Sequence, residues 1–126
     1  MEELPQISES MRPTYELLLT EIASHLEFFE ESCSRCSALT NSAALEDTLE
    51  ELSTKLAHRF HVIKGGSGFL QLKAIQLASK EAEDLFKNGI DASLRTEDIL
   101  AKLQQSVEVL RKEEQALRQL LEGTKS

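Results

Sequence analysis

The amino-acid sequence predicts an all-α protein, an antiparallel four-helix bundle, and three observations lead to this fold class. Apolar residues recur at helical spacing in four segments, and no segment alternates apolar and polar residues as a half-buried strand would. Aromatic residues make up only 5% of the chain, and five glycines and two prolines leave few turn formers. The links between the segments are short, which favours antiparallel neighbours.

The first two helices are placed by their starts and by their apolar stripes. Pro13 suits the first turn of a helix, where its missing N–H would have no partner anyway. The polar residues 40–42 are candidate N-caps for the second helix. The predicted stripes are Tyr15, Leu18, Leu19, Ile22, Leu26, Phe29 and Cys33 in the first helix, and Leu45, Leu49, Leu52, Leu56, Phe60 and Ile63 in the second.

The third helix is expected to begin near Leu72 and to stop at Asn88-Gly89, a favourable C-terminal signal. The fourth starts at Thr96, with two acidic residues in its first turn that suit the helix dipole, and ends at Gly123. Their predicted stripes are Ile75, Ala78, Ala82, Leu85 and Phe86, and then Leu100, Leu103, Val107, Leu110, Leu117 and Leu121. We therefore expect a flexible leader over residues 1–12, the bundle over 13–122 and a tail over 123–126.

The composition excludes several classes of partner. The chain has 22 acidic and 14 basic side chains and a net charge of −8, so it repels phosphate backbones and anionic lipid. We expect neither nucleic-acid nor membrane binding, and no apolar run approaches a membrane span or a secretory signal. Two cysteines cannot build a disulfide framework, and they favour a reducing, cytoplasmic setting.

Residues 61–70, His-Val-Ile-Lys-Gly-Gly-Ser-Gly-Phe-Leu, are the most informative stretch. At about 100° per residue, His61 lies roughly 150° from the centre of the second helix's apolar stripe and therefore faces water. Lys64 and Gly65 follow one turn later on the same face, and Gly68 two turns later. Helical glycines cost about 1 kcal/mol each relative to alanine. Either the helix ends at these glycines, or a bare face beside an exposed imidazole lets another protein approach closely.

This block resembles the signature of histidine phosphotransfer (HPt) domains. It is closest to the His-x-Ile-Lys-Gly-Gly-x-Gly pattern of the N-terminal phosphotransfer domain of CheA-type chemotaxis kinases, and the likeness extends over about residues 13–121. The resemblance implies an HPt-like bundle with the phosphorylated histidine on the exposed face of the second helix. It also implies a phosphorelay role in two-component, chemotaxis-like signalling.

The resemblance implies a role for each matching residue. His61 matches the phospho-accepting histidine, and Lys64 matches the lysine that steadies the phosphoryl group. Gly65 and Gly68 match the glycines that clear the docking surface. Glu83 matches the carboxylate that hydrogen-bonds the other ring nitrogen of the histidine, which fixes the tautomer.

Two positions depart from the family pattern. Lys80 stands where CheA-type domains often carry a second histidine of the hydrogen-bonded network, so it is a possible network member. Gln71 stands where the family usually has a glycine, ten residues past the histidine. From the residues alone, Gln76, Lys80 and Glu83 form a row at the edge of the third helix's apolar stripe, and one of them could face His61.

The implied partners are a histidine kinase catalytic domain, which phosphorylates His61, and the receiver domain of a response regulator, whose aspartate then takes the phosphoryl group. The sequence has no Gly-rich loop followed by Lys and Ser/Thr, so ATP and Mg²⁺ are expected only in partner domains. No cofactor and no metal site is expected in this chain. The domain would be a substrate and relay rather than a self-sufficient enzyme, and it could equally be a segment of a larger kinase.

Alternatives remain open at several positions. His58, one turn before His61, is expected on the partner-binding surface and is an alternative acceptor. Cys33-Ser34-Arg35-Cys36 is a C-x-x-C motif for which burial is expected and a thiol switch is the alternative. The acidic run over residues 46–51 is a solvated face or steers a partner. The alternative function is a helical interaction module that keeps the HPt shape and has lost phosphotransfer.

Overall fold

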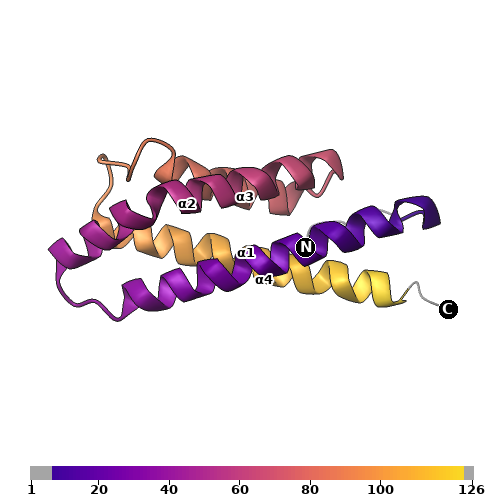
Figure 1. The fold of residues 1–126 in the computed structure, drawn as a ribbon, viewed down its shortest axis with the longest axis horizontal. Helices are drawn as coiled ribbons and strands as arrows, with labels where there is room; N and C mark the ends of the chain where they lie inside the picture. Colours follow the sequence, from indigo (N-terminus) through magenta and orange to yellow (C-terminus); the bar gives the residue numbers. More distant parts are fainter. Residues whose placement is uncertain (1–6, 124–126) are drawn as a thin grey trace.

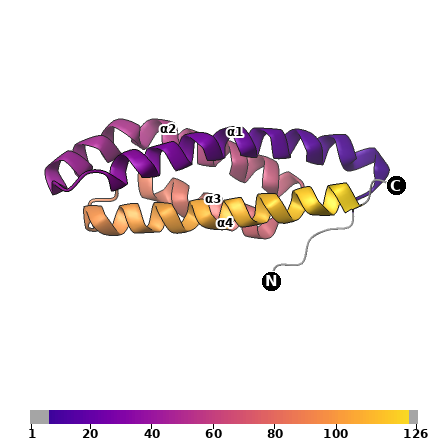
Figure 2. The same cartoon turned by 90° about the horizontal axis from the view of Figure 1, so that it is seen from below.

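The computed structural model describes residues 7–123, which contain four α-helices, one short 3₁₀ helix and no strand. The elements are η1 (Glu9–Met11), α1 (Arg12–Ser37), α2 (Ser42–Phe69), α3 (Lys73–Phe86) and α4 (Thr96–Gly123). In Figure 1, α2 and α3 form the upper pair of the bundle and α1 and α4 the lower pair. Figure 2 shows α1 and α4 side by side along the length of the molecule. The predicted all-α four-helix bundle is confirmed.

The core follows the predicted apolar stripes. Every stripe residue predicted for α2 and α3 is buried, and Phe29 of α1 stacks on Phe60 of α2 with ring centroids 4.0 Å apart. The four helices therefore share one apolar interior, which leaves the opposite face of α2 exposed to solvent. No helix within residues 7–123 has the length and the apolar character that crossing a membrane requires.

Two predicted stripe positions are corrected. At the start of α4, Ile99 is fully buried, whereas the predicted Leu100 is only partly buried. At the end of α1, Cys36 is fully buried, whereas the predicted Cys33 is partly buried. In both cases the two alternative residues lie on opposite sides of the centre of the apolar stripe. The packing of adjacent helices decides which of the two is covered.

The glycines of residues 65–68 lie inside α2, so the interpretation of this block as a helix stop is wrong. α2 begins at its predicted polar cap, where Asn41 Oδ1 accepts the backbone N–H groups of Ala43 and Ala44 at 2.8 and 3.2 Å. It then continues to Phe69. Buried residues on both sides of the glycines, Ile63 and Leu70, hold this segment on the core, and their burial outweighs the low helix propensity of glycine.

A tight turn joins α2 to α3. The N–H of Leu72 donates to the carbonyl of Ser67 at 2.8 Å, and the N–H of Gln71 donates to that of Gly68 at 3.1 Å. This pair of bonds is the Schellman motif, which requires a left-handed residue directly after the C-cap, here Leu70. Gln71 has a φ of 59° and occupies that position. The turn therefore forms with glutamine at the position where the family usually has glycine.

The chain ends are described in part. Residues 1–6 of the predicted leader and 124–126 of the predicted tail lie outside the described residues. In the described part of the leader, Ile7 and Met11 pack partly buried against the core, and α1 begins one residue before Pro13. After α3, Gly89 takes a φ of 82° at the predicted Asn-Gly stop.

Candidate functional site

The site lies between α2 and α3. The three residues that join these helices make them antiparallel neighbours, so the C-terminal half of α2 runs along α3. Two contacts mark the register: His61 meets Glu83, and Gly68 lies against the side-chain amide of Gln76. Residues separated by 22 positions in the sequence are thereby held within hydrogen-bond distance.

Glu83 is the centre of the site because its carboxylate contacts two nitrogen atoms from α2. His61 Nδ1 lies 2.9 Å from Glu83 Oε2, and Lys64 Nζ lies 2.6 Å from Glu83 Oε1. The Glu83 side chain is only 8% exposed, whereas the imidazole of His61 is 64% exposed. The three residues thus form a cluster in which the carboxylate is buried and the histidine faces solvent.

The charge of Glu83 determines the orientation of the histidine. Burial would raise the pKa of the Glu83 carboxyl, but hydrogen bonds from Lys64 and His61 outweigh it, and the pKa lies below its ordinary value. An ionised carboxylate can only accept hydrogen bonds, so Nδ1 of His61 must carry the proton of the 2.9 Å contact. Nε2 is then the ring nitrogen available as a nucleophile.

The glycines of the block differ in their surroundings. A Cβ added at Gly65 would have no heavy atom within 4 Å, so α2 is bare there. At Gly68 it would lie 2.7 Å from the Gln76 amide nitrogen, and at Gly66 it would lie 3.0 Å from a methyl group of Leu18. Gly65 therefore opens the surface beside His61, Gly68 accommodates α3, and Gly66 accommodates α1.

The other predicted residues lie at the border of the cluster. His58 is exposed one turn before His61, as predicted from its spacing. Lys80 is exposed, and its ion pair is with Asp84 at 3.1 Å rather than with the His61–Glu83 pair. Of the row that the sequence left open, Glu83 is the residue that faces His61.

Sequence reasoning missed the apolar part of this surface. Val62 and Phe69 are 37% and 77% exposed, and together with Gly65 they lie at i, i+3 and i+7 of α2. The sequence could have indicated their exposure, because both apolar residues fall outside the apolar stripe of the second helix. Ser79, one turn before Glu83 on α3, is fully buried, and its hydroxyl has no hydrogen-bond partner among the described residues.

The two cysteines have the character of core residues. Burial, together with the nearby Cys36 and Glu30, raises the pKa of the Cys33 thiol to about 11. Burial also raises the pKa of Cys36. Thiols of this kind are poor nucleophiles at neutral pH, which disfavours a thiol switch. Within residues 7–123, no group of three or more His, Cys, Asp or Glu side chains is arranged to hold a metal ion.

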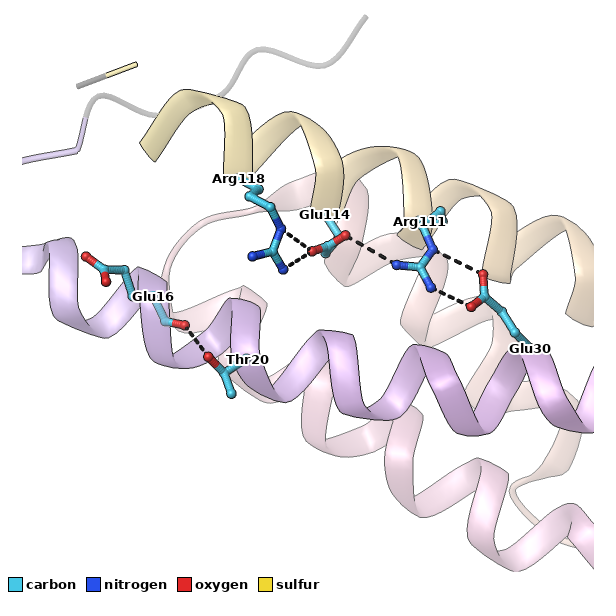
Figure 3. Close-up of polar contacts among 6 residues, drawn as sticks. All are labelled: Glu16, Thr20, Glu30, Arg111, Glu114 and Arg118. Carbon is cyan, nitrogen blue, oxygen red and sulfur yellow. Dashed lines mark hydrogen bonds and ion pairs between the residues drawn. The ribbon is translucent and has the colours of Figure 1, made fainter. Parts of the chain in front are cut away.

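A second buried carboxylate lies between α1 and α4 (Figure 3). The side chain of Glu114 is 3% exposed and contacts Arg111 at 3.5 Å and Arg118 at 2.9 Å. Arg111 also reaches across to Glu30 of α1, with Nε 3.1 Å from the carboxylate. This cluster consists of carboxylates and guanidinium groups and contains no histidine or thiol, so its role is structural.

The comparison with protein families agrees with this geometry. A family model described as Hpt domain matches residues 14–123, which is most of the chain and includes all but the first two residues of the four α-helices. Searches of curated proteins and of solved structures found no match.

Proposed function

This chain belongs to the Hpt domain family, which acts in two-component phosphorelays, and on that premise we propose that His61 is its phosphoryl acceptor. The observation that carries the proposal is the solvent-exposed imidazole whose Nδ1 is held by the buried carboxylate of Glu83. His61 is the histidine for which the tautomer, the exposure and the bare neighbouring helix surface agree.

The first step joins the imidazole to phosphorus. The lone pair of His61 Nε2 attacks the γ-phosphorus of ATP held by a histidine kinase catalytic domain, an N–P bond forms, and the P–O bond to ADP breaks. Glu83 acts as a positioning residue, because its carboxylate accepts the hydrogen bond from Nδ1–H, which keeps its proton, and stabilises the positive charge that develops on the ring. Lys64 places a cation next to the growing charge on the phosphoryl oxygens.

The second step returns the imidazole to its starting state. A carboxylate oxygen of the receiver's aspartate attacks phosphorus, the N–P bond breaks, and its electron pair returns to Nε2. The acceptor must approach His61 closely, and the bare surface at Gly65 provides the space. Exposed Val62 and Phe69 add apolar contact area beside it. ATP and Mg²⁺ would be held by the partner domains.

We further infer that the pathway is of the chemotaxis type. The His-x-Ile-Lys-Gly-Gly-x-Gly pattern of residues 61–68 and the shared contact of Lys64 and His61 with Glu83 support a CheA-like domain. We also propose a cytoplasmic location, which the two free cysteines and the acidic composition favour.

The test of the acceptor is phosphorylation by a CheA-type kinase core with γ-labelled ATP. We expect an acid-labile label that disappears in His61→Gln and persists in His58→Gln, which changes a neighbouring exposed histidine in the same way. Label that persists in His61→Gln would overturn the assignment. No label with any of several competent kinases would instead support the helical interaction module.

The test of the docking surface uses the glycine with open surroundings. Gly65→Leu should preserve the helical circular dichroism spectrum, because no heavy atom would meet a new Cβ, and should block transfer to a receiver domain. Gly123→Leu, where the surroundings are also open, is the matched control and should transfer normally. Normal transfer by Gly65→Leu would exclude this face from docking.

A further inference from the structure

The exposed face of α2 changes its sign of charge halfway along the helix. Residues 42–54 contain four acidic side chains (Glu46, Asp47, Glu50 and Glu51) and no lysine or arginine. Residues 55–69 contain Lys55, Arg59 and Lys64, together with two histidines, and no acidic side chain. This segregation occurs in a chain whose net charge is −8.

The negative and positive parts belong to one continuous surface. At 100° per residue, Asp47, Glu51, His58 and Gly65 lie within about 40° of each other around the helix axis. The first three are exposed, and the Gly65 surface is open. A partner that lies along α2 over His61 therefore meets positive charge at one end and negative charge at the other.

Several of these charges are available to a partner. Lys55 and Asp47 are exposed and have no ion pair within the described part of the chain. Arg59 lies over the ring of Phe28 at 4.2 Å and near His25 Nδ1 at 3.1 Å, neither of which cancels its charge. Glu51 is paired with Arg35, and Lys64 with Glu83.

The cations of this surface can offset the repulsion between the two anions that meet in phosphotransfer. A phosphohistidine and a carboxylate acceptor are both anions, and they repel each other as they approach. At physiological ionic strength this interaction is screened over about 8 Å. Lys55 lies about 9 Å along the helix axis from His61 and about 120° around it, with exposed His58 between them, whereas Asp47 lies about 21 Å away along the axis. A partner that covers the exposed face around His58 therefore meets both His61 and Lys55, and the acidic run acts on a separate part of that partner.

We propose that α2 orients its acceptor by charge, so that an acidic face of a receiver domain docks over residues 55–65 and is kept away from residues 46–51. The inference rests on the proposed function, because it concerns the partner that takes the phosphoryl group from His61. The apolar side chains Val62 and Phe69 supply contact area on the same surface. The charges set the orientation and speed of encounter more than the final affinity.

The test compares two charge reversals of equal size on this face. Lys55→Glu and Asp47→Lys each change the charge by two at an exposed position without an ion pair, and both should keep the helical spectrum. Each variant is first labelled on His61, so that a failure of phosphorylation is recognised as a failure of the proposed function. Association with a receiver domain that takes the label is then measured by stopped flow at several salt concentrations.

We expect Lys55→Glu to slow association about fivefold at physiological salt, with the difference vanishing near 1 M salt. Asp47→Lys should stay within twofold of the wild type at physiological salt. Association that rises in Asp47→Lys as much as it falls in Lys55→Glu would mean that only net charge matters, and would overturn the proposal. Unchanged association in both variants would also overturn it.

Discussion

Two buried carboxylates, Glu83 and Glu114, lie in different halves of the bundle and are neutralised in related ways. Glu83 faces α2 and contacts His61 and Lys64 across the α2–α3 interface. Glu114 faces α1 and contacts Arg111 and Arg118 from its own helix (Figure 3). A buried carboxylate is costly unless it is paired and hydrogen-bonded, and each has two nitrogen-bearing partners.

The difference lies in the partners. Arg111 and Arg118 present guanidinium groups, which only donate hydrogen bonds and offer no nitrogen lone pair to a partner. His61 can present a free nitrogen lone pair, and its ring is 64% exposed, so the Glu83 cluster can react with a partner. The electrostatic requirement is the same in both clusters. A reactive site arises where one of the compensating groups is both titratable and exposed.

The largest expected effect is on the rate of His61 phosphorylation, which should depend on Glu83 and not on Glu114. Glu83→Gln should lower the rate of His61 phosphorylation by about 10- to 100-fold, because a neutral amide, which can donate as well as accept, replaces the charged acceptor that fixes the tautomer and stabilises the ring charge. Glu114→Gln should leave that rate within twofold, because the residue lies between α1 and α4. Single-turnover labelling at saturating kinase measures both. Equal losses in the two variants would mean that the clusters are not functionally distinct.

The next effect concerns stability, for which we expect Glu114 to matter although it does not matter for phosphorylation. Glu114→Gln should lower the free energy of unfolding by about 1–2 kcal/mol, measured by urea denaturation. The loss should stay below that of breaking a fully buried pair, because the side chains of Arg111 and Arg118 are 35% and 48% exposed and can turn to water. Glu114→Asp, which keeps the charge on a shorter side chain, is the matched control. An unchanged midpoint in Glu114→Gln would show that this network contributes nothing to stability.

A smaller effect concerns acid stability. The pKa of Glu83 is lower in the folded protein than its ordinary value of 4.5, so its ionised form stabilises the fold above that pH. The stability that the ionised carboxylate adds relative to Glu83→Gln should therefore be fully present above about pH 4.5. It should shrink as the pH falls below about 4.5 and through the folded pKa. Urea midpoints between pH 5 and pH 3 measure it, and a difference that grows over this range would contradict the assigned shift.

The sequence was sufficient for the fold because periodicity reports directly on which face of each helix is buried. From the residues alone Glu83 was one of three candidates with Gln76 and Lys80, and the family resemblance pointed to Glu83. Its contact with His61 follows from the register of α2 against α3, which periodicity does not give. The Glu114 cluster was not predicted. A glutamate between Leu110 and Leu117 interrupts the apolar stripe, and a single sequence gives no sign that two arginines on the same helix let it occupy the core.

The smallest predicted effect concerns the turn that sets this register. Gln71 has a φ of 59°, where a residue with a Cβ is strained by about 1–2 kcal/mol and glycine is not. Part of that gain is lost because glycine has more freedom in the unfolded chain. Gln71→Gly should therefore raise the free energy of unfolding by about 0.5 kcal/mol, and Gln71→Ala, which keeps the Cβ, should not. Urea denaturation measures both.

Because the turn already forms the Schellman bonds with glutamine, phosphorylation of His61 should keep its rate in both variants. A faster rate in Gln71→Gly would instead show that the strained turn misplaces Glu83 relative to His61.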